Sequence, residues 1–464
     1  MIPVQLRFIF KAHMPQFTYS KDQFETIAAD LLAQAKKAGA TASSVSVSEG
    51  FGLSVNARQG KAETIEQTRD KGIALTIHVG KRRGNASTSD FSIASLKSTV
   101  QAASDIARYT AEDDCAGLPD QAQIVGKDVA LTDLSLYHPW DVSSEGALKL
   151  AVQAETAAVT FSPMIQNSDG ASVSTHQGHF VSANSLGFCA GYAYSRHSLS
   201  VAPIAKLGKL MQREGWYSSV RKAVDMADPT TLGVYAAKRA LSRLSARRIK
   251  TQKVPVLFEA PIAIGLIGSF VQAASGGSLY RQSSFLVDTL GKSIFADHIS
   301  IEEDPFVLGG FASSVFDDEG VATKARRVVN GGTLEGYFLS SYSARKLGMT
   351  TTGNAGGSHN LHMLSAHTEA ADDLPAMLKK LGTGLLVTEL MGQGVNYVNG
   401  DYSRGASGYW VKNGAIQFAV EEITIAGNLK DMFKQIVAIG SDVDRRGSKC
   451  TGSVLIEQMS IAGN

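Results

Sequence analysis

The sequence is poor in cysteine, in long apolar runs and in net charge. Its three cysteines, Cys115, Cys189 and Cys450, are odd in number and far apart, so we expect no disulfide framework and a reducing, cytoplasmic compartment. No run approaches the roughly 18 apolar residues of a membrane helix. A net charge of +2 argues against a nucleic-acid binder, whose affinity would rest on many phosphate contacts. We therefore expect neither a membrane nor a nucleic acid as a partner.

The sequence also lacks the patterns of the common catalytic sites. None of the ten histidines is followed by Glu, so no His-Glu-x-x-His zinc helix exists. There is no Gly-x-Ser-x-Gly elbow, phosphate-binding loop or dinucleotide fingerprint. His176 and His179 would point to opposite faces of a strand, and His359 and His362 follow a glycine-rich loop without a neighbouring Glu. We predict no catalytic residue and no metal site in this chain.

The N-terminal part contains clear helix and strand patterns. Ser20 and Gln23 form a capping box ahead of an apolar helical pattern. Residues 44–49 and 72–79 alternate as strands, and residues 58–61 are typical of a hairpin turn. These features predict an α/β layer in which helices cover one face of a mostly antiparallel sheet.

The rest of the chain is predicted to form a middle α/β region and a C-terminal β-rich region. A helix should begin at Asp228 and run to about Arg248, with a basic end that suits the helix dipole. In the last third, Asn413-Gly414 favours a hairpin. The predicted fold class is α+β. The predicted divisions are an extension over 1–18 that is disordered or misassigned, with Met14 as the alternative start, an α/β domain over 19–112, a middle α/β domain over 120–250 and a β-rich domain over 251–464.

Two kinds of segment are candidates for binding. Glycines, aromatics and polar donors alternate over residues 392–404, which suits recognition of an extended peptide backbone. An ordinary β-meander with glycine-rich turns explains the same pattern equally well. The acidic runs at residues 302–304 and 317–319 are interpreted as solvated turns, with a cation site as the lesser alternative.

Several segments resemble one protein family. Residues 340–348 (SSYSARKLG), 352–357 (TGNAGG) and 399–410 (NGDYSRGASGYW) are similar to the PmbA (TldE) branch of the PmbA/TldD protease family. Residues 279–286, 316–321, 420–428 and 456–463 are also similar to this branch. The resemblance covers nearly the whole chain after Met14 and is strongest from Leu279 onward. The long matches without gaps make it specific.

The resemblance implies a heterodimer in which a TldD-like subunit carries zinc and cleaves small or unfolded peptides inside a closed cavity. It places the relatives' zinc helix near residues 265–277, which hold no usual zinc ligand here. Cys450 lies in the neighbourhood of the relatives' third ligand, and we interpret it as an ordinary thiol. No cofactor is expected in this chain, and zinc is expected in the TldD-like partner.

The resemblance and the glycine-rich loops together predict a substrate-binding wall. Three segments, 280–281, 356–359 and 401–404, are expected to converge on one cavity. Glycines in these segments allow a peptide backbone to approach closely. Arg281 and Arg404 offer forked donors that suit peptide carbonyls and carboxylates. The alternative is that Arg404 pairs with Asp401 or a glutamate and holds a turn. The predicted substrate-binding residues are Tyr280, Arg281, His359, Asp401, Tyr402 and Arg404.

The leading hypothesis is therefore a cytoplasmic subunit without metal that shapes a protease cavity and binds substrate peptide. The first rival is a free-standing homodimer that binds peptides or acts like a chaperone without catalysis. The second rival is an independent hydrolase with an unrecognised site, which the missing motifs disfavour.

Overall fold

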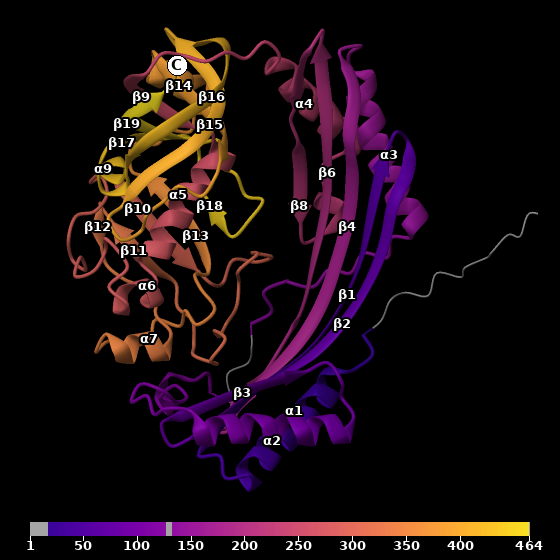
Figure 1. The fold of residues 1–464 in the computed structure, drawn as a ribbon, viewed down its shortest axis with the longest axis vertical. Helices are drawn as coiled ribbons and strands as arrows, with labels where there is room; N and C mark the ends of the chain where they lie inside the picture. The colour runs from indigo at the N-terminus through magenta and orange to yellow at the C-terminus, as the bar shows by residue number, and fades with distance from the viewer. Residues whose placement is uncertain (1–16, 127–131, 464) are drawn as a thin grey trace, which may run out of the picture.

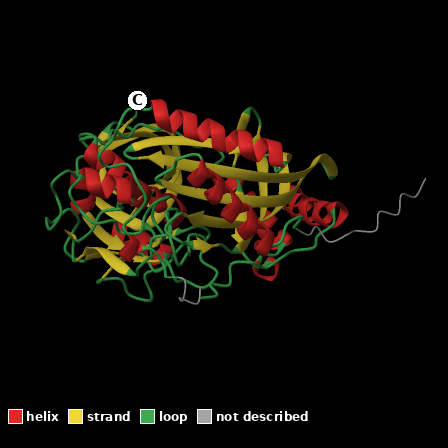
Figure 2. Ribbon diagram, turned by 90° about the horizontal axis from the view of Figure 1, so that it is seen from below, coloured by secondary structure: helices red, strands yellow, loops and turns green. Residues whose placement is uncertain are grey.

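The computed structural model describes residues 17–126 and 132–463, which form two bodies that face one another (Figure 1). One is a long curved sheet backed by helices, and the other is a C-terminal domain of shorter strands and helices. In Figure 2 the loops gather on the side of the C-terminal domain. Most of the predicted extension, residues 1–16, lies outside the described part. Thr18 belongs to the fold, because its backbone amide donates to the buried Glu49 carboxylate at 2.8 Å.

The long sheet begins in the N-terminal part of the chain. Ser20 and Gln23 form the predicted capping box, and the predicted hairpin joins the first two strands. The first strand is much longer than the predicted 44–49. At Gly52 a Cβ would lie 2.9 Å from the Thr175 carbonyl oxygen, so glycine lets the neighbouring strand pack closely here. The elements are α1 (Lys21–Lys37), β1 (Ala42–Arg58), β2 (Lys61–Val79), β3 (Arg82–Thr88) and α2 (Ile93–Tyr109).

The middle region adds strands to the same sheet rather than forming a sheet of its own. The order is β3-β2-β1-β4-β6-β7, with β5 paired to β4 and β8 paired to β6, and all pairings are antiparallel. Strands from the predicted divisions 19–112 and 120–250 thus share one sheet. The added elements are η1 (Gln121–Gln123), α3 (Ser144–Thr160), β4 (Ile165–Asn184), β5 (Cys189–Ala190), β6 (Ala193–Leu207), β7 (Leu210–Arg213), β8 (Trp216–Val220), η2 (Ala223–Asp225) and α4 (Pro229–Ser242).

Helices cover one face of this sheet. Alternate strand residues such as Val45, Val47 and Val55 are buried, because every second side chain of a strand points to the same face. They join one core with Leu31 of α1 and another with Ala236 of α4. None of the described helices is both long and apolar enough to span a membrane.

Asp228 caps the start of helix α4 as predicted, but the helix ends at Ser242 rather than near Arg248. The basic residues beyond it do not extend the helix. Arg247 instead lies over the ring of Phe418, 3.7 Å from its centre, and Arg248 contacts the carboxylate of Glu422. Contacts with the C-terminal domain thus take the place of the predicted interaction with the helix dipole.

The C-terminal domain is β-rich, and the predicted α+β class is confirmed. Its two sheets have the orders β12-β11-β10-β13-β18 and β16-β15-β14-β9-β19-β17. The predicted hairpin at Asn413 joins β15 to β16. One large core includes α5 side chains such as Phe270 and strands of both sheets. The elements are β9 (Gln252–Phe258), α5 (Ala260–Ala273), α6 (Gly276–Tyr280), β10 (Ile299–Asp304), β11 (Arg326–Asn330), β12 (Thr333–Leu334), α7 (Ser341–Lys346), β13 (Asn360–Ser365), α8 (Leu374–Leu381), β14 (Gly384–Met391), β15 (Asp401–Lys412), β16 (Ala415–Asn428), α9 (Leu429–Lys434), β17 (Ile436–Ile439), β18 (Lys449–Cys450) and β19 (Val454–Ala462).

A buried ion-pair network joins the two bodies. Arg239 contacts Glu259 at 2.7 Å and Glu214 at 3.2 Å. Arg243 contacts Glu214 at 2.6 Å and Glu389 at 2.5 Å. Both arginines lie in or just after α4, whereas Glu259 and Glu389 belong to the C-terminal domain. The arginine side chains are 13% and 6% exposed, so their charges depend on these partners.

Replacing Arg239 with Met should lower the free energy of unfolding by about 3–5 kcal/mol, because the nearly buried Glu259 carboxylate loses its partner. Urea unfolding measures the change. The control is Arg213→Met, which breaks a 2.9 Å pair with Asp169 whose side chains are 64% and 43% exposed. That variant should lose no more than about 1 kcal/mol. Equal losses in both variants would contradict a structural role for the buried network.

Candidate functional site

The face of the long sheet that the helices leave uncovered carries small polar side chains. Along β1 these are Ser44, Ser46 and Ser48, which alternate with the buried valines. Their partners in β4 are Asn184, Ser182 and Phe180 in the same order. Hydroxyl groups on an open strand face can bond to a ligand, whereas the strand backbones are already paired. This face forms one wall of the cavities between the two bodies.

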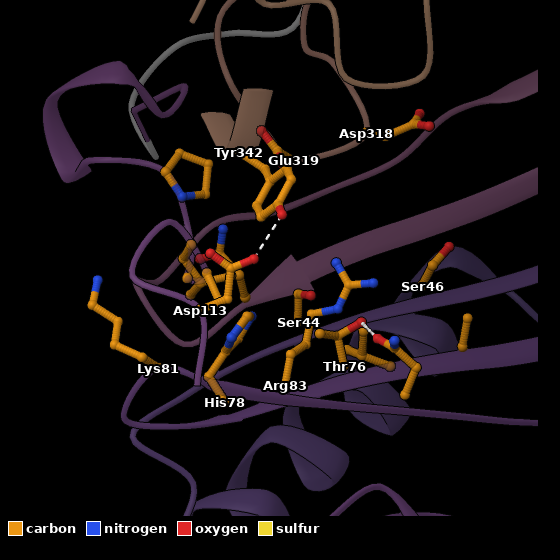
Figure 3. A pocket seen from close by; sticks show the side chains of 18 of the residues that line it. Ser44, Ser46, Thr76, His78, Lys81, Arg83, Asp113, Asp318, Glu319 and Tyr342 are labelled. Carbon is orange, nitrogen blue, oxygen red and sulfur yellow. Dashed lines mark hydrogen bonds between the residues drawn. The ribbon is translucent and has the colours of Figure 1, made fainter. Parts of the chain in front are cut away.

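The larger cavity, of about 920 Å³, lies between this sheet face, residues 110–119 and the C-terminal domain (Figure 3). We call it the linker cavity. Side chains of β1, β2 and β3 line it from the sheet, and side chains of α6, α7 and the preceding loop line it from the C-terminal domain. Lining residues include Ser44, Thr76, His78, Arg83, Tyr280 and Tyr342.

One edge of the linker cavity is fixed by α7. Tyr342 donates to the Asp113 carboxylate at 2.6 Å, and Lys346 does so at 2.8 Å. These hydrogen bonds lower the pKa of Asp113 to about 2, and the bond from Lys346 has the larger effect. Arg345 donates to the carbonyls of Cys115 and Gly117, each at 3.3 Å. The SSYSARKLG segment therefore holds the linker against the C-terminal domain.

The smaller cavity, of about 540 Å³, adjoins the first, because Ser182 and Asp318 line both. We call it the aromatic cavity. Its walls include five Phe and Tyr rings, two arginines and two aspartates. The rings are those of Phe180, Tyr192, Tyr194, Phe311 and Phe316, and the arginines and aspartates are Arg196, Arg221, Asp317 and Asp318.

Two arginines of the sheet hold a C-terminal loop at the aromatic cavity. Arg221 donates to the carbonyl oxygens of Ser195 at 2.8 Å, Gly310 at 3.1 Å and Phe311 at 3.2 Å. Arg196 and Arg221 both lie over the Phe311 ring, 4.8 and 5.1 Å from its centre. Arg221 thus ties the sheet to the loop, while Arg196 remains exposed to the cavity.

The structure brings the first two predicted site segments to adjoining cavities. Tyr280 lines the linker cavity, and Arg281 donates to its hydroxyl at 2.9 Å. His359 lines the aromatic cavity but is only 8% exposed. Its ring nitrogens lie 3.2 Å from the Ala312 carbonyl oxygen and 2.9 Å from that of Gly353. These contacts hold the ring in place and leave it little freedom to bind substrate.

The third predicted segment lies in β15 and lines neither cavity. The Asp401 carboxylate accepts hydrogen bonds from Asn399 at 2.6 Å and Asn428 at 3.1 Å. Tyr402 is 3% exposed, and burial raises its pKa to about 12, with the neighbouring Arg404 acting in the opposite direction. Arg404 therefore interacts with Tyr402 rather than with Asp401. A role of this segment in binding peptide stays a prediction without support from the cavities.

Sequence reasoning missed several residues of the site. Arg196 and Arg221 belong to none of the motifs found in the sequence. Tyr342 was recognised only as part of a family segment. Asp318 was assigned to a solvated turn. The available signal was the polar face of β4 and β6, which alternates with buried residues such as Val173.

Three parts of the chain match the domains of one family. Residues 43–107 match the PmbA/TldA metallopeptidase domain 1, residues 137–244 the central domain and residues 251–463 the C-terminal domain. The metalloprotease PmbA of Escherichia coli O157:H7 is 46% identical over 432 residues, which is 93% of this chain and 94% of that protein. The chain belongs to the PmbA/TldD metallopeptidase family.

Further matches include a TldD homolog and two solved structures. A metalloprotease TldD homolog of Haemophilus influenzae is 27% identical over 227 residues, 45% of each chain. A crystal structure from Bacteroides thetaiotaomicron, described as a modulator of DNA gyrase, has a TM-score of 0.89 at 24% identity and covers 95% of this chain and 99% of that one. TldE from Thermococcus kodakarensis has a TM-score of 0.80 at 18% identity and covers 94% and 99%. Both structures share the fold.

Because the family is one of metallopeptidases, a zinc site would need suitable ligands in this chain. Helix α5 has no His, Cys, Asp or Glu between Ala260 and Ala273. Cys450 lies opposite His362 in the register of β18 and β13. Burial raises the pKa of the Cys450 thiol, which disfavours the thiolate that would bind a metal. No group of three or more His, Cys, Asp or Glu suited to a metal occurs among residues 17–126 and 132–463. This residue set does not fit a catalytic zinc site, which needs three protein ligands.

The pH dependence of stability should reflect His78 at the linker cavity. Burial, with Arg83, Arg345 and Lys81 nearby, lowers its pKa to about 4. In the unfolded chain, His78 binds a proton at its ordinary pKa near 6.5. The contribution of His78 to stability is therefore present above pH 6.5 and is lost as the pH falls toward 4. Full loss is about 3 kcal/mol.

Urea unfolding at pH 7 and pH 4.5 measures this effect. The wild-type chain should lose about 2–3 kcal/mol more than His78→Gln over that range. The exposed His367 provides the control, because His367→Gln should keep the wild-type pH dependence. An unchanged pH dependence in His78→Gln would contradict the assignment.

Proposed function

We propose that this chain is the subunit without metal of a cytoplasmic TldD/TldE-type metalloprotease. In this proposal it binds small or unfolded peptides in the linker and aromatic cavities, and a TldD-like subunit supplies the zinc. The observation that carries the proposal is a pair of adjoining cavities with hydroxyl, aromatic and charged walls, in a described chain without a three-ligand metal set. Membership of the metallopeptidase family and the TldE-like fold support it.

The cavity walls suit a peptide. Volumes of about 920 and 540 Å³ lie in the range of ligand sites. Ser44, Ser46 and Ser182 offer hydroxyls that can donate to and accept from a peptide backbone. Arg196 offers a forked donor suited to carbonyl oxygens and carboxylates. Aromatic rings can pack against apolar side chains of any sequence, which fits a broad range of peptides.

The proposed roles of the two subunits follow from the chemistry that each chain can supply. Zinc lowers the pKa of a bound water so that it can attack a peptide carbonyl at neutral pH. This chain would bind the peptide, orient it and exclude water from part of its length. Its arginines and hydroxyls need no metal for that role.

The two rival functions make different predictions. A free-standing homodimer that binds peptides or acts like a chaperone would bind peptide without forming a complex with a TldD-like chain. An independent hydrolase would cleave peptide alone. The proposed subunit should bind peptide, form a complex with the TldD-like chain and contribute to cleavage only in that complex.

We expect chelator-sensitive cleavage of an unfolded peptide only when this chain is mixed with a TldD-like subunit. The assay compares each chain alone with the mixture, and elemental analysis measures zinc in each sample. This chain alone should contain background zinc and show negligible cleavage. Cys450→Ala should leave its metal content at background.

Three outcomes would contradict the proposal. About one zinc per purified chain would place a metal site here. Robust cleavage by this chain alone that survives chelation would favour the independent hydrolase. Peptide binding without any complex or cleavage in the mixture would favour the homodimer.

A further inference from the structure

Three consecutive acidic residues, Asp317, Asp318 and Glu319, have different roles in the structure. The Asp317 carboxylate is buried and accepts hydrogen bonds from three backbone amides at 2.9 to 3.0 Å. The Glu319 carboxylate accepts from the backbone amide of Ser341 at 2.8 Å, at the start of α7. Both acids therefore serve the fold. Asp318 is the one that these local contacts do not explain.

Asp318 is exposed and lines the linker cavity (Figure 3). It also lines the aromatic cavity, so it lies where the two cavities meet. No hydrogen bond or ion pair reaches its carboxylate from any residue that the structure describes. Its backbone is fixed, because its amide donates to the Ala355 carbonyl at 3.1 Å. A Cβ on Gly356 would lie 2.4 Å from Asp318 Oδ2, so the carboxylate rests directly on this glycine. The group is held in place without a partner.

The surroundings of Asp318 favour a positively charged ligand. Although the side chain opens onto the cavities, the surrounding protein raises its pKa above the ordinary value, with His359 acting in the opposite direction. A cation close to such a carboxylate gains more than it would at an open surface, because the local dielectric is lower. A ligand cation would supply the missing partner.

Three aromatic rings line the same cavity as this carboxylate. Phe180 and Tyr192 have ring centres 4.7 Å apart, and Phe316 lies 5.8 Å from Tyr192 and 6.3 Å from Phe180. All three rings line the aromatic cavity. Ring faces attract ammonium groups within about 6 Å, and they also pack against the apolar part of the chain that carries the ammonium.

The same cavity contains the opposite charge. Arg196 and Arg221 lie over Phe311 and bring two positive charges to the cavity. A free metal cation gains nothing from them. A peptide can place an ammonium group at Asp318 and direct carbonyl or carboxylate oxygens toward Arg196. The pair of charges therefore favours a peptide over a simple cation.

We propose that Asp318 binds the ammonium group of a substrate peptide, with Phe180, Tyr192 and Phe316 forming the adjoining wall. The ammonium group is either the free amino terminus or a lysine side chain. This inference rests on the proposed function in peptide binding. It adds a specific chemical requirement on the peptide, namely a primary ammonium group.

Binding to the full-length chain tests the proposal. The probes are three versions of one unstructured eight-residue peptide, labelled at the carboxyl end, and fluorescence anisotropy measures affinity. The first has a free amino terminus, the second is acetylated, and the third is acetylated and carries one lysine. At least one ammonium-bearing version should bind about 10- to 100-fold more tightly than the acetylated version without lysine.

Asp318→Asn keeps the size of the side chain and should abolish that preference. The matched control is Asp141→Asn, since Asp141 is exposed and lines neither cavity. It should keep the wild-type preference. The version that loses affinity in Asp318→Asn identifies the ammonium source as the amino terminus or the lysine.

Two results would overturn the assignment. One is equal binding, or no binding, of all three peptides to the wild-type chain. The other is an undiminished preference in Asp318→Asn. If the mixture with a TldD-like subunit still shows zinc-dependent cleavage, the ammonium site alone has failed. If the Asp318→Asn effect is present but the mixture does not cleave, the proposed subunit role has failed and the ammonium site stands.

Discussion

The ion pairs of the two buried arginines, Arg239 and Arg243, with three glutamates set the position of the C-terminal domain against the long sheet, and both cavities depend on that position. Such pairs contribute little net stability, because each charge loses its hydration, but they strongly disfavour arrangements that leave one charge unpaired. Arg221 and the contact of Tyr342 with Asp113 join the same two bodies elsewhere. Polar contacts at separate points thus hold the walls apart at a fixed spacing.

The sheet itself makes this arrangement possible. One face is covered by helices and is apolar, while the other carries serines and glycines that neither fill the space nor attract a second apolar layer. A sheet with one polar face can border a hydrated cavity without exposing a large apolar surface. Aromatic and charged side chains enter only where β4 and β6 face the C-terminal loops, and this is where a ligand would find specific contacts.

Local signals in the sequence predicted local structure well. The capping box at Ser20, the hairpin at Asn413 and the helix start at Asp228 are each fixed by neighbouring residues, and the structure contains all three. The predicted end of α4 was wrong, because the contact of Arg247 with the C-terminal domain overrides the local preference for helix. The sharing of one sheet by two predicted regions, and the location of Asp318 between two cavities, depend on distant segments. No local pattern carries that information.

The most direct test of the account is to locate a bound peptide on the chain. A peptide with a photoreactive phenylalanine would be crosslinked to this chain within the mixed complex, and mass spectrometry would map the adducts, with excess unlabelled peptide as the competition control. The account predicts competed adducts within 176–196, 311–318 and 355–359. Competed adducts confined to residues 396–404, or to the face covered by helices, would contradict it.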